Sequence, residues 1–209
     1  MIVKPLTMAA AALCLAGCIS LLPEPPPPSA IYSLRAGPVE PLGGAPKPLV
    51  LAVAEPTAPR SVSGADIVWR RDSTIAFMEG AVWDGAAPDL LQAMLVDVMD
   101  RRGGVRAVVR AGGGVRADAE VRWDILAFEV VEDGSRLEAR IETVAQLLTL
   151  RDRMVVAHAR FDATAPISSR SGRAAAAALE RVATEAAIKT ADWAVATAQV
   201  QPSAASTSR

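Results

Sequence analysis

The clearest pattern in the chain is a long alternation of apolar and polar residues in its second half. The first apolar positions are Ala119, Val121, Trp123, Ile125 and Ala127. The apolar set then shifts by one residue to Phe128 and Val130, which indicates a β-bulge or a strand covered on both faces. Asp133 and Gly134 suit a hairpin turn, and a second turn is expected at Arg151–Arg153. This period of two predicts three long antiparallel strands that form a meander, each with one polar face.

Shorter apolar runs bounded by proline, glycine or charged residues predict the other strands. They cover residues 31–34, 49–54, 66–70, 73–78 and 105–110. Two further segments repeat their apolar residues every three or four positions, as amphipathic helices do. We expect these helices at about 88–101 and 172–198, the first with Pro88 in its first turn and the second capped by Ser169 or Ser171.

Together these elements predict an α+β fold: a mixed, mainly antiparallel sheet with a long three-stranded meander, covered on one face by two helices. The helix at 172–198 carries one apolar stripe that should lie against the sheet, made of Leu179, Val182, Ala186, Thr190 and Trp193. The patterns place Trp123 and Trp193 in the core. Trp69, beside Arg70 in a less regular stretch, is the tryptophan we expect at a partner interface, because tryptophan is enriched in binding hot spots.

The N-terminus has the layout of a bacterial lipoprotein signal. Lys4 precedes an apolar run from Leu6 to Leu15, as in secretory signals. The run ends in the lipobox Leu15, Ala16, Gly17 and Cys18. We therefore expect residues 1–17 to be a signal peptide and Cys18 to be the lipidated first residue of the mature protein, anchored by acyl chains that each contribute about 0.8 kcal/mol per buried methylene. An ordinary cleaved signal with a chance cysteine and an uncleaved short anchor are the alternatives.

Four segments are thus predicted along the chain. After the signal peptide, residues 18–30 form a lipidated, proline-rich tether, which at about 3.1 Å per residue spans roughly 40 Å from Cys18 to Ile31. Residues 31–198 form one domain, and the small, polar residues 199–209 are predicted to be disordered. Beyond the signal, the sequence contains no apolar run of the 18 or so residues that a membrane span requires.

Charge and cysteine content exclude several classes of function. Loss of Lys4 with the signal leaves 21 basic against 23 acidic residues, so no basic footprint for nucleic acid is present. Cys14 lies within the signal, which leaves Cys18 as the one mature cysteine and excludes a disulfide within the chain. Without a second histidine or mature cysteine, no metal-ligand cluster is expected.

Candidate chemistry is sparse as well. The one histidine, His158, falls on the polar side of its strand, and no nucleophile is marked beside it. The arginines and glutamates at 136–142 are typical of a solvated or partner-facing sheet surface, and the glycines at 111–114 of a hairpin connection. We therefore predict a protein that is not an enzyme and has no catalytic residues, metal or cofactor.

Several short features, taken in order, resemble one family. They are the lipobox at Cys18, Tyr32 and Leu34 after the proline-rich spacer, the run Asp66, Ile67, Val68 and Arg70, Trp83 ahead of the helix with Pro88, Leu90 and Leu91, the Phe128–Glu129 step, and an alanine-rich helix ending near Trp193. This order and spacing are similar to those of the ABC-type transport auxiliary lipoproteins, including the PqiC-like proteins of MCE-domain lipid transport systems. The resemblance covers most of residues 15–198.

The resemblance implies a non-catalytic, periplasm-facing component that works with an ABC permease and ATPase and with an MCE-domain protein to move lipids, either bound to partners or as a homo-oligomer. Ile19 follows the lipidated cysteine where an aspartate would favour the inner membrane, so the outer membrane is expected. A lipoprotein whose own body carries a lipid as a chaperone, without an ABC transporter, is the alternative. An envelope hydrolase is the least favoured hypothesis.

Overall fold

The structure is a computed structural model that describes residues 28–198. In this range the elements are β1 (Ala30–Tyr32), β2 (Lys47–Val53), β3 (Asp66–Arg71), β4 (Thr74–Trp83), α2 (Ala87–Arg102), β5 (Val105–Arg110), β6 (Ala119–Asp133), β7 (Arg136–Thr149), β8 (Val155–Pro166) and α3 (Gly172–Thr197). Cys18, most of the tether and residues 199–209 lie outside the described residues, so the anchor and the tail stay predictions.

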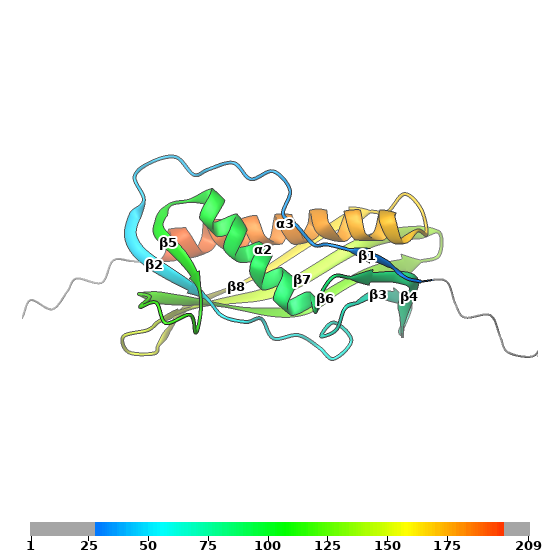
Figure 1. Ribbon diagram of the computed structural model, residues 1–209, viewed down its shortest axis with the longest axis horizontal. Coiled ribbons are helices and arrows are strands. Elements are labelled where there is room, and N and C mark those ends of the chain that lie inside the picture. Colours follow the sequence, from blue (N-terminus) through cyan, green and yellow to red (C-terminus); the bar gives the residue numbers. More distant parts are fainter. Residues whose placement is uncertain (1–27, 199–209) are drawn as a thin grey trace, which may run out of the picture.

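The strands form a mixed eight-stranded sheet, and both helices lie on one of its faces, where they also pack against each other (Figure 1). The α+β class, the antiparallel meander of β6, β7 and β8, and the two helices predicted from the sequence are therefore confirmed. Neither α2 nor α3 is apolar enough over a sufficient length to cross a bilayer. The two ends of the described chain emerge at opposite ends of the molecule (Figure 1).

Strand β6 organises the sheet. One of its edges pairs with β7 along its whole length. Its other edge is shared by two short parallel strands, β2 beside Ala119–Val121 and β3 beside Glu129–Glu132. Between them Thr57 makes an isolated bridge to Asp124. Strand β2 in turn pairs with β5. Strand β3 pairs with β4, and β4 pairs with β1. The predicted bulge is present at Leu126, between Ile125 and Ala127.

Two hairpin turns differ from the sequence prediction by one residue. Asp133 pairs with Arg136, so the β6–β7 turn consists of Gly134 and Ser135 rather than Asp133 and Gly134. Gly134 has φ of 58°, which suits a glycine in the first central position of a type II′ turn. In the β3–β4 hairpin Arg71 pairs with Thr74, so the turn is Asp72 and Ser73, whereas the strands predicted at 66–70 and 73–78 place it at Arg71 and Asp72.

The helix-covered face of the sheet is filled by apolar side chains. Trp123 is 1% exposed, and Trp83 stacks on Phe128 with 5.8 Å between ring centroids. The stripe predicted for α3 packs into this core, with Trp193 half-buried and edge-on to Phe161 of β8. Alternation in β6, β7 and β8 therefore supplies one face of the core and the helices supply the other.

The ends of α3 are satisfied by side chains from other segments. At its N-terminus the Ser171 hydroxyl accepts a hydrogen bond from the Ala174 N–H at 3.3 Å, which confirms one of the two predicted caps. At its C-terminus Lys47 Nζ of β2 donates to the carbonyls of Val195 at 2.5 Å and Ala198 at 2.8 Å. A cation at this end also opposes the negative end of the helix dipole.

The first residue of α3 must be small. A Cβ on Gly172 would lie 2.6 Å from the Ala81 Cβ of β4 and 3.2 Å from the Tyr32 hydroxyl of β1. The glycine therefore allows the helix to start directly against the two outer strands. This contact joins the helical layer to the end of the sheet where the described chain begins.

We predict that Gly172→Ala lowers the free energy of unfolding by about 1–3 kcal/mol, the usual cost of overpacking. In an Ala81→Gly background the same substitution should cost less, because the contacting methyl is gone. Urea denaturation followed by tryptophan fluorescence measures both, with Gly43→Ala, which meets no neighbour, as the control. Equal costs in the two backgrounds would show that the close approach does not exist.

Candidate functional site

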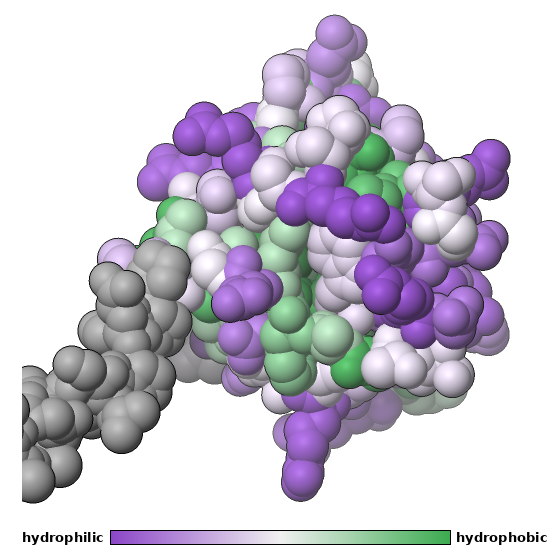
Figure 2. All heavy atoms as spheres, turned by 90° about the vertical axis from the view of Figure 1, so that its right-hand side faces the viewer, coloured by the Kyte–Doolittle hydropathy of each residue, from purple (hydrophilic) through white to green (hydrophobic). Residues whose placement is uncertain are grey.

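The β3–β4 hairpin lies at the end of the molecule where the described chain begins (Figure 1). Seen from that end, apolar surface is exposed between charged side chains (Figure 2). The hairpin carries Trp69 and Arg70, the two residues predicted for a partner interface. Its geometry therefore decides what this end of the protein can bind.

On the helix-bearing face, three side chains converge on the buried carboxylate of Glu132. Trp69 Nε1 donates to Glu132 Oε2 at 3.0 Å, and Arg71 donates to the same oxygen at 2.7 and 3.1 Å. Arg170, from the loop that leads into α3, pairs with the other oxygen, Oε1. Glu132 is only 5% exposed. One carboxylate thus joins β6, the hairpin and the start of α3.

On the opposite face, Glu129 holds the hairpin in a similar way. Arg70 Nε and a terminal nitrogen donate to the two Glu129 oxygens, each at 2.8 Å. Because Arg70 alternates with Trp69 and Arg71 along β3, its side chain points to the other side of the sheet. Bidentate arginine–carboxylate pairs fix orientation as well as distance. Hydrogen bonds and salt bridges on both faces of the sheet therefore hold the hairpin to β6.

These interactions hold Glu132 in its ionised form. Hydrogen bonds from Arg71, and then from Trp69 and Arg170, lower the pKa of Glu132 to about 2, although burial opposes them. A general base works best with a pKa near the operating pH. Glu132 is therefore suited to anchoring the hairpin and poorly suited to proton transfer.

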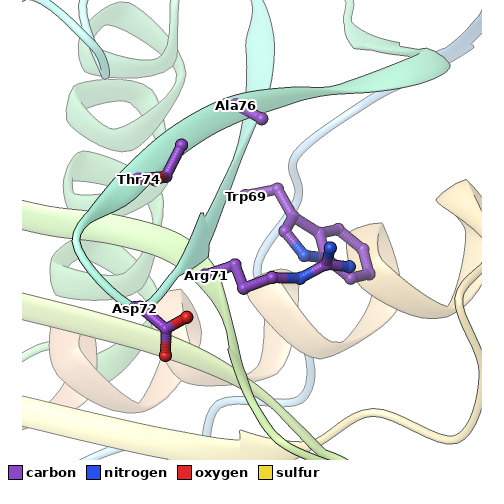
Figure 3. A pocket seen from close by; sticks show the side chains of 5 residues that line it. All are labelled: Trp69, Arg71, Asp72, Thr74 and Ala76. Atoms are coloured by element: carbon purple, nitrogen blue, oxygen red, sulfur yellow. The ribbon is translucent and has the colours of Figure 1, made fainter.

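The hairpin also forms a small pocket of about 350 Å³. Trp69 and Arg71 of β3 project to the same side, Thr74 and Ala76 of β4 border the space, and Asp72 lies at the turn (Figure 3). The small side chain of Ala76 leaves the space beside the Trp69 indole open. The pocket thus belongs to the outer edge of the sheet and not to its interior.

The structure separates the two residues proposed together for an interface. Trp69 and Arg70 are adjacent in β3 but lie on opposite faces, each bound to a different glutamate. A partner in contact with both would have to straddle the outer edge of the hairpin. Whether they bind a partner stays a prediction.

Other sequence expectations fall on the surface. His158 is exposed on β8, on the face opposite its half-buried neighbours Ala157 and Ala159, as alternation predicts. The charged residues of β7 form surface pairs, Arg140 with Glu142 and, at 3.8 Å, Arg136 with Glu138. Among residues 28–198 no group of three or more histidine, cysteine, aspartate or glutamate side chains is arranged to hold a metal ion.

Glu132 and Arg170 were missed by the sequence reasoning. Glu132 continues the apolar alternation of Phe128 and Val130, so a carboxylate at a core-facing position was the available signal. Such a group requires charged or hydrogen-bonding partners. Arg170 carries no local signal, because its loop meets Glu132 only in the folded protein.

A family model for the "ABC-type transport auxiliary lipoprotein component" matches residues 32–191. The chain belongs to this family. It is therefore an auxiliary lipoprotein component of ABC-type transport, and the family suggests a membrane-anchored, periplasm-facing protein with a non-catalytic role.

Two solved structures are similar to this chain. The auxiliary lipoprotein is 31% identical to protein XCC0632 from Xanthomonas campestris, of the DUF330 family, with a TM-score of 0.75 over 81% of this chain and 96% of that one. A second, uncharacterized protein shares the fold at 15% identity and a TM-score of 0.62, over 82% of this chain and all of that one. No curated protein matches the sequence.

The low pKa of Glu132 predicts an acid-dependent stability. Its pKa is about 2 when folded and about 4.3 in an unfolded chain, so the unfolded state binds more protons between these values. The stability that ionised Glu132 contributes is present above about pH 4.3 and is lost as the pH falls towards 2. The destabilisation caused by Glu132→Gln should therefore shrink over this window.

Urea denaturation at a series of pH values checks this, with Glu138→Gln on the exposed face of β7 as the matched control. A Glu132→Gln penalty that stays constant from neutral pH down to about 2 would contradict the assignment.

Proposed function

We propose that this auxiliary lipoprotein is a non-catalytic adaptor of an ABC/MCE-type system that moves lipids across the cell envelope. Cys18 would tether it to the inner leaflet of the outer membrane, and the body would contact the transport proteins rather than carry the lipid. The ATPase partner would supply the energy. Family membership supports the link to an ABC transporter, and the sequence resemblance supports the lipid cargo and the MCE partner.

The observation that favours an adaptor over a lipid chaperone is the packing between helices and sheet. A carrier needs an apolar cavity for an acyl chain, and this interlayer space is where an α+β body would provide one. Here Leu91 and Leu95 of α2, Leu179 of α3 and Ile141 of β7 fill that space, each with 0% of its surface exposed. An acyl chain could enter only by displacing such side chains, at a cost of several kcal/mol.

The anchor and the core use different residues, which separates tethering from folding. We predict that Cys18→Ala leaves the melting temperature of the body unchanged but moves the protein from the outer-membrane fraction to the soluble fraction. Fractionation with a salt wash measures the release. A Cys18→Ala protein that still sediments with outer membranes would contradict the anchor assignment.

Affinity purification of the full chain from mildly solubilised membranes separates the two candidate functions. The adaptor predicts that an ABC permease, its ATPase and an MCE-domain protein co-purify, with much less than one lipid per chain. The chaperone predicts one bound lipid per chain and none of these proteins. Mass spectrometry of the same sample reads both the proteins and the lipids, and the second result would overturn the proposal.

A further inference from the structure

The outer half of β4 is an open edge of the sheet. Strand β3 pairs with one side of β4, but β1 covers the other side only at Ala81–Trp83. Along Thr74–Met78 every second residue therefore directs its N–H and C=O away from β3. Within the described part of the chain, no other backbone group bonds to this stretch.

Two other outer strands of the sheet, β5 and β8, carry features that discourage added strands, and the outer half of β4 does not. Strand β5 has Arg106 and Arg110, and β8 has Arg160 and Asp162. Charged residues and proline are the usual protection of an edge. Thr74–Met78 reads Thr-Ile-Ala-Phe-Met, with neither charge nor proline.

Large apolar side chains are exposed along the same edge. Phe77 is 53% exposed and Ile75 is 42% exposed, and both alternate to the same face of β4. Ile31 of β1, which pairs with Val82 farther along β4, is 70% exposed. On the other face the pocket beside Trp69 opens next to Ala76. The edge thus combines free backbone groups with side-chain contacts on both faces.

We propose that Thr74–Met78 is a docking edge for an extended segment of another protein, which adds to the sheet as a strand beside β4. Backbone hydrogen bonds would provide affinity, and side chains on alternate positions would provide specificity. On one face the segment would set apolar residues beside Ile75 and Phe77, and on the other it would insert an apolar side chain over Ala76 towards Trp69. This mode of binding goes beyond the adaptor role and does not depend on which transport system the protein serves.

The chain's own N-terminal segment is a poor occupant of the edge. It leads directly into β1, but it contains Pro25–Pro28, which have no N–H to donate to a ladder. A segment with four consecutive prolines is therefore unsuited to extend β1 along β4. The end of α3 lies at the opposite end of the molecule (Figure 1).

A second copy fits less well than a free peptide strand. If two β4 strands paired antiparallel about Ala76, Ser73 of one copy would stand opposite Glu79 of the other. Strand β1 begins with Ala30 beside Ala81, two residues beyond Glu79, and the chain enters β1 there through Pro28 and Ser29. The hairpin turn of the second copy would therefore meet the segment before β1, whereas a strand of about five residues would end before it.

Selection from a displayed library of random decapeptides, with the full chain held in lipid nanodiscs, tests the proposal. We expect enriched peptides with apolar residues at alternate positions. Phe77→Lys should weaken their binding at least tenfold, because it places a charge on the edge. Val156→Lys, at an exposed apolar position on the edge strand β8, is the matched control and should leave binding unchanged. N-methylation of every second residue of a selected peptide should abolish binding when the methylated nitrogens face β4. Methylation of the intervening nitrogens should leave binding intact.

Three results would overturn the proposal: no enriched peptides, binding that is insensitive to Phe77→Lys, or binding that persists whichever set of alternate peptide nitrogens is methylated. A peptide-free dimer in sedimentation that Phe77→Lys dissociates would assign the edge to a second copy and would also overturn it. Because these assays contain no transporter, their failure is distinct from a failure to co-purify the transport proteins.

Discussion

The backbone pairing of β6 is the constraint on which the rest of the structure depends. Its fifteen residues bond to β7 on one edge and to both β2 and β3 on the other. Since each neighbour then carries its own partners, the loss of β6 would leave three separate fragments of sheet: β1–β4–β3, β2–β5 and β7–β8. The helices pack over the face where β6 supplies Trp123, Phe128 and Val130, so the core is built on the same strand.

Two buried carboxylates extend this constraint to the surface. Glu129 and Glu132 both belong to β6, and between them they bind Arg70 on one face and Trp69, Arg71 and Arg170 on the other. Buried charges are costly unless paired and hydrogen-bonded, and here every arginine–glutamate contact also links two segments of the chain. The β3–β4 hairpin is held from within while its outer edge stays open. An interior filled with side chains and a fixed, open edge suit a protein that binds partners better than one that encloses a ligand.

The sequence predicted the features that depend on local patterning. The meander, the bulge near Ala127 and both helices follow from periods of two and of three to four residues, which neighbouring side chains impose. The parallel pairings of β2 with β5 and of β3 with β6 join segments far apart in the chain, and no local pattern marks them. The turn at Gly134 was misplaced because Asp-Gly also suits a type I′ turn, and the ladder register decides between the two.

The candidate site was only partly predictable for the same reason. The presence of tryptophan beside arginine pointed to the hairpin at Trp69 and Arg70. The sequence did not indicate that these two residues face opposite sides of the sheet, or that Glu132 links Trp69 to the loop before α3. That information resides in the pairing of β3 with β6, which brings Trp69 beside Val130. The lipobox at Cys18, by contrast, can be recognised from the sequence alone. The lipid anchor that it implies remains a prediction.

Amide hydrogen exchange of the full chain, resolved by residue, tests most directly whether β6 and its glutamates hold a hairpin whose outer edge is free. The account predicts that β6 amides exchange only through global unfolding. In Thr74–Met78, amides bonded to β3 should be protected, while the alternate, outward amides exchange orders of magnitude faster. Uniformly fast exchange of the hairpin amides would show that Glu129 and Glu132 do not hold the hairpin to β6. Uniform protection of the Thr74–Met78 amides in the absence of a partner would contradict the open edge.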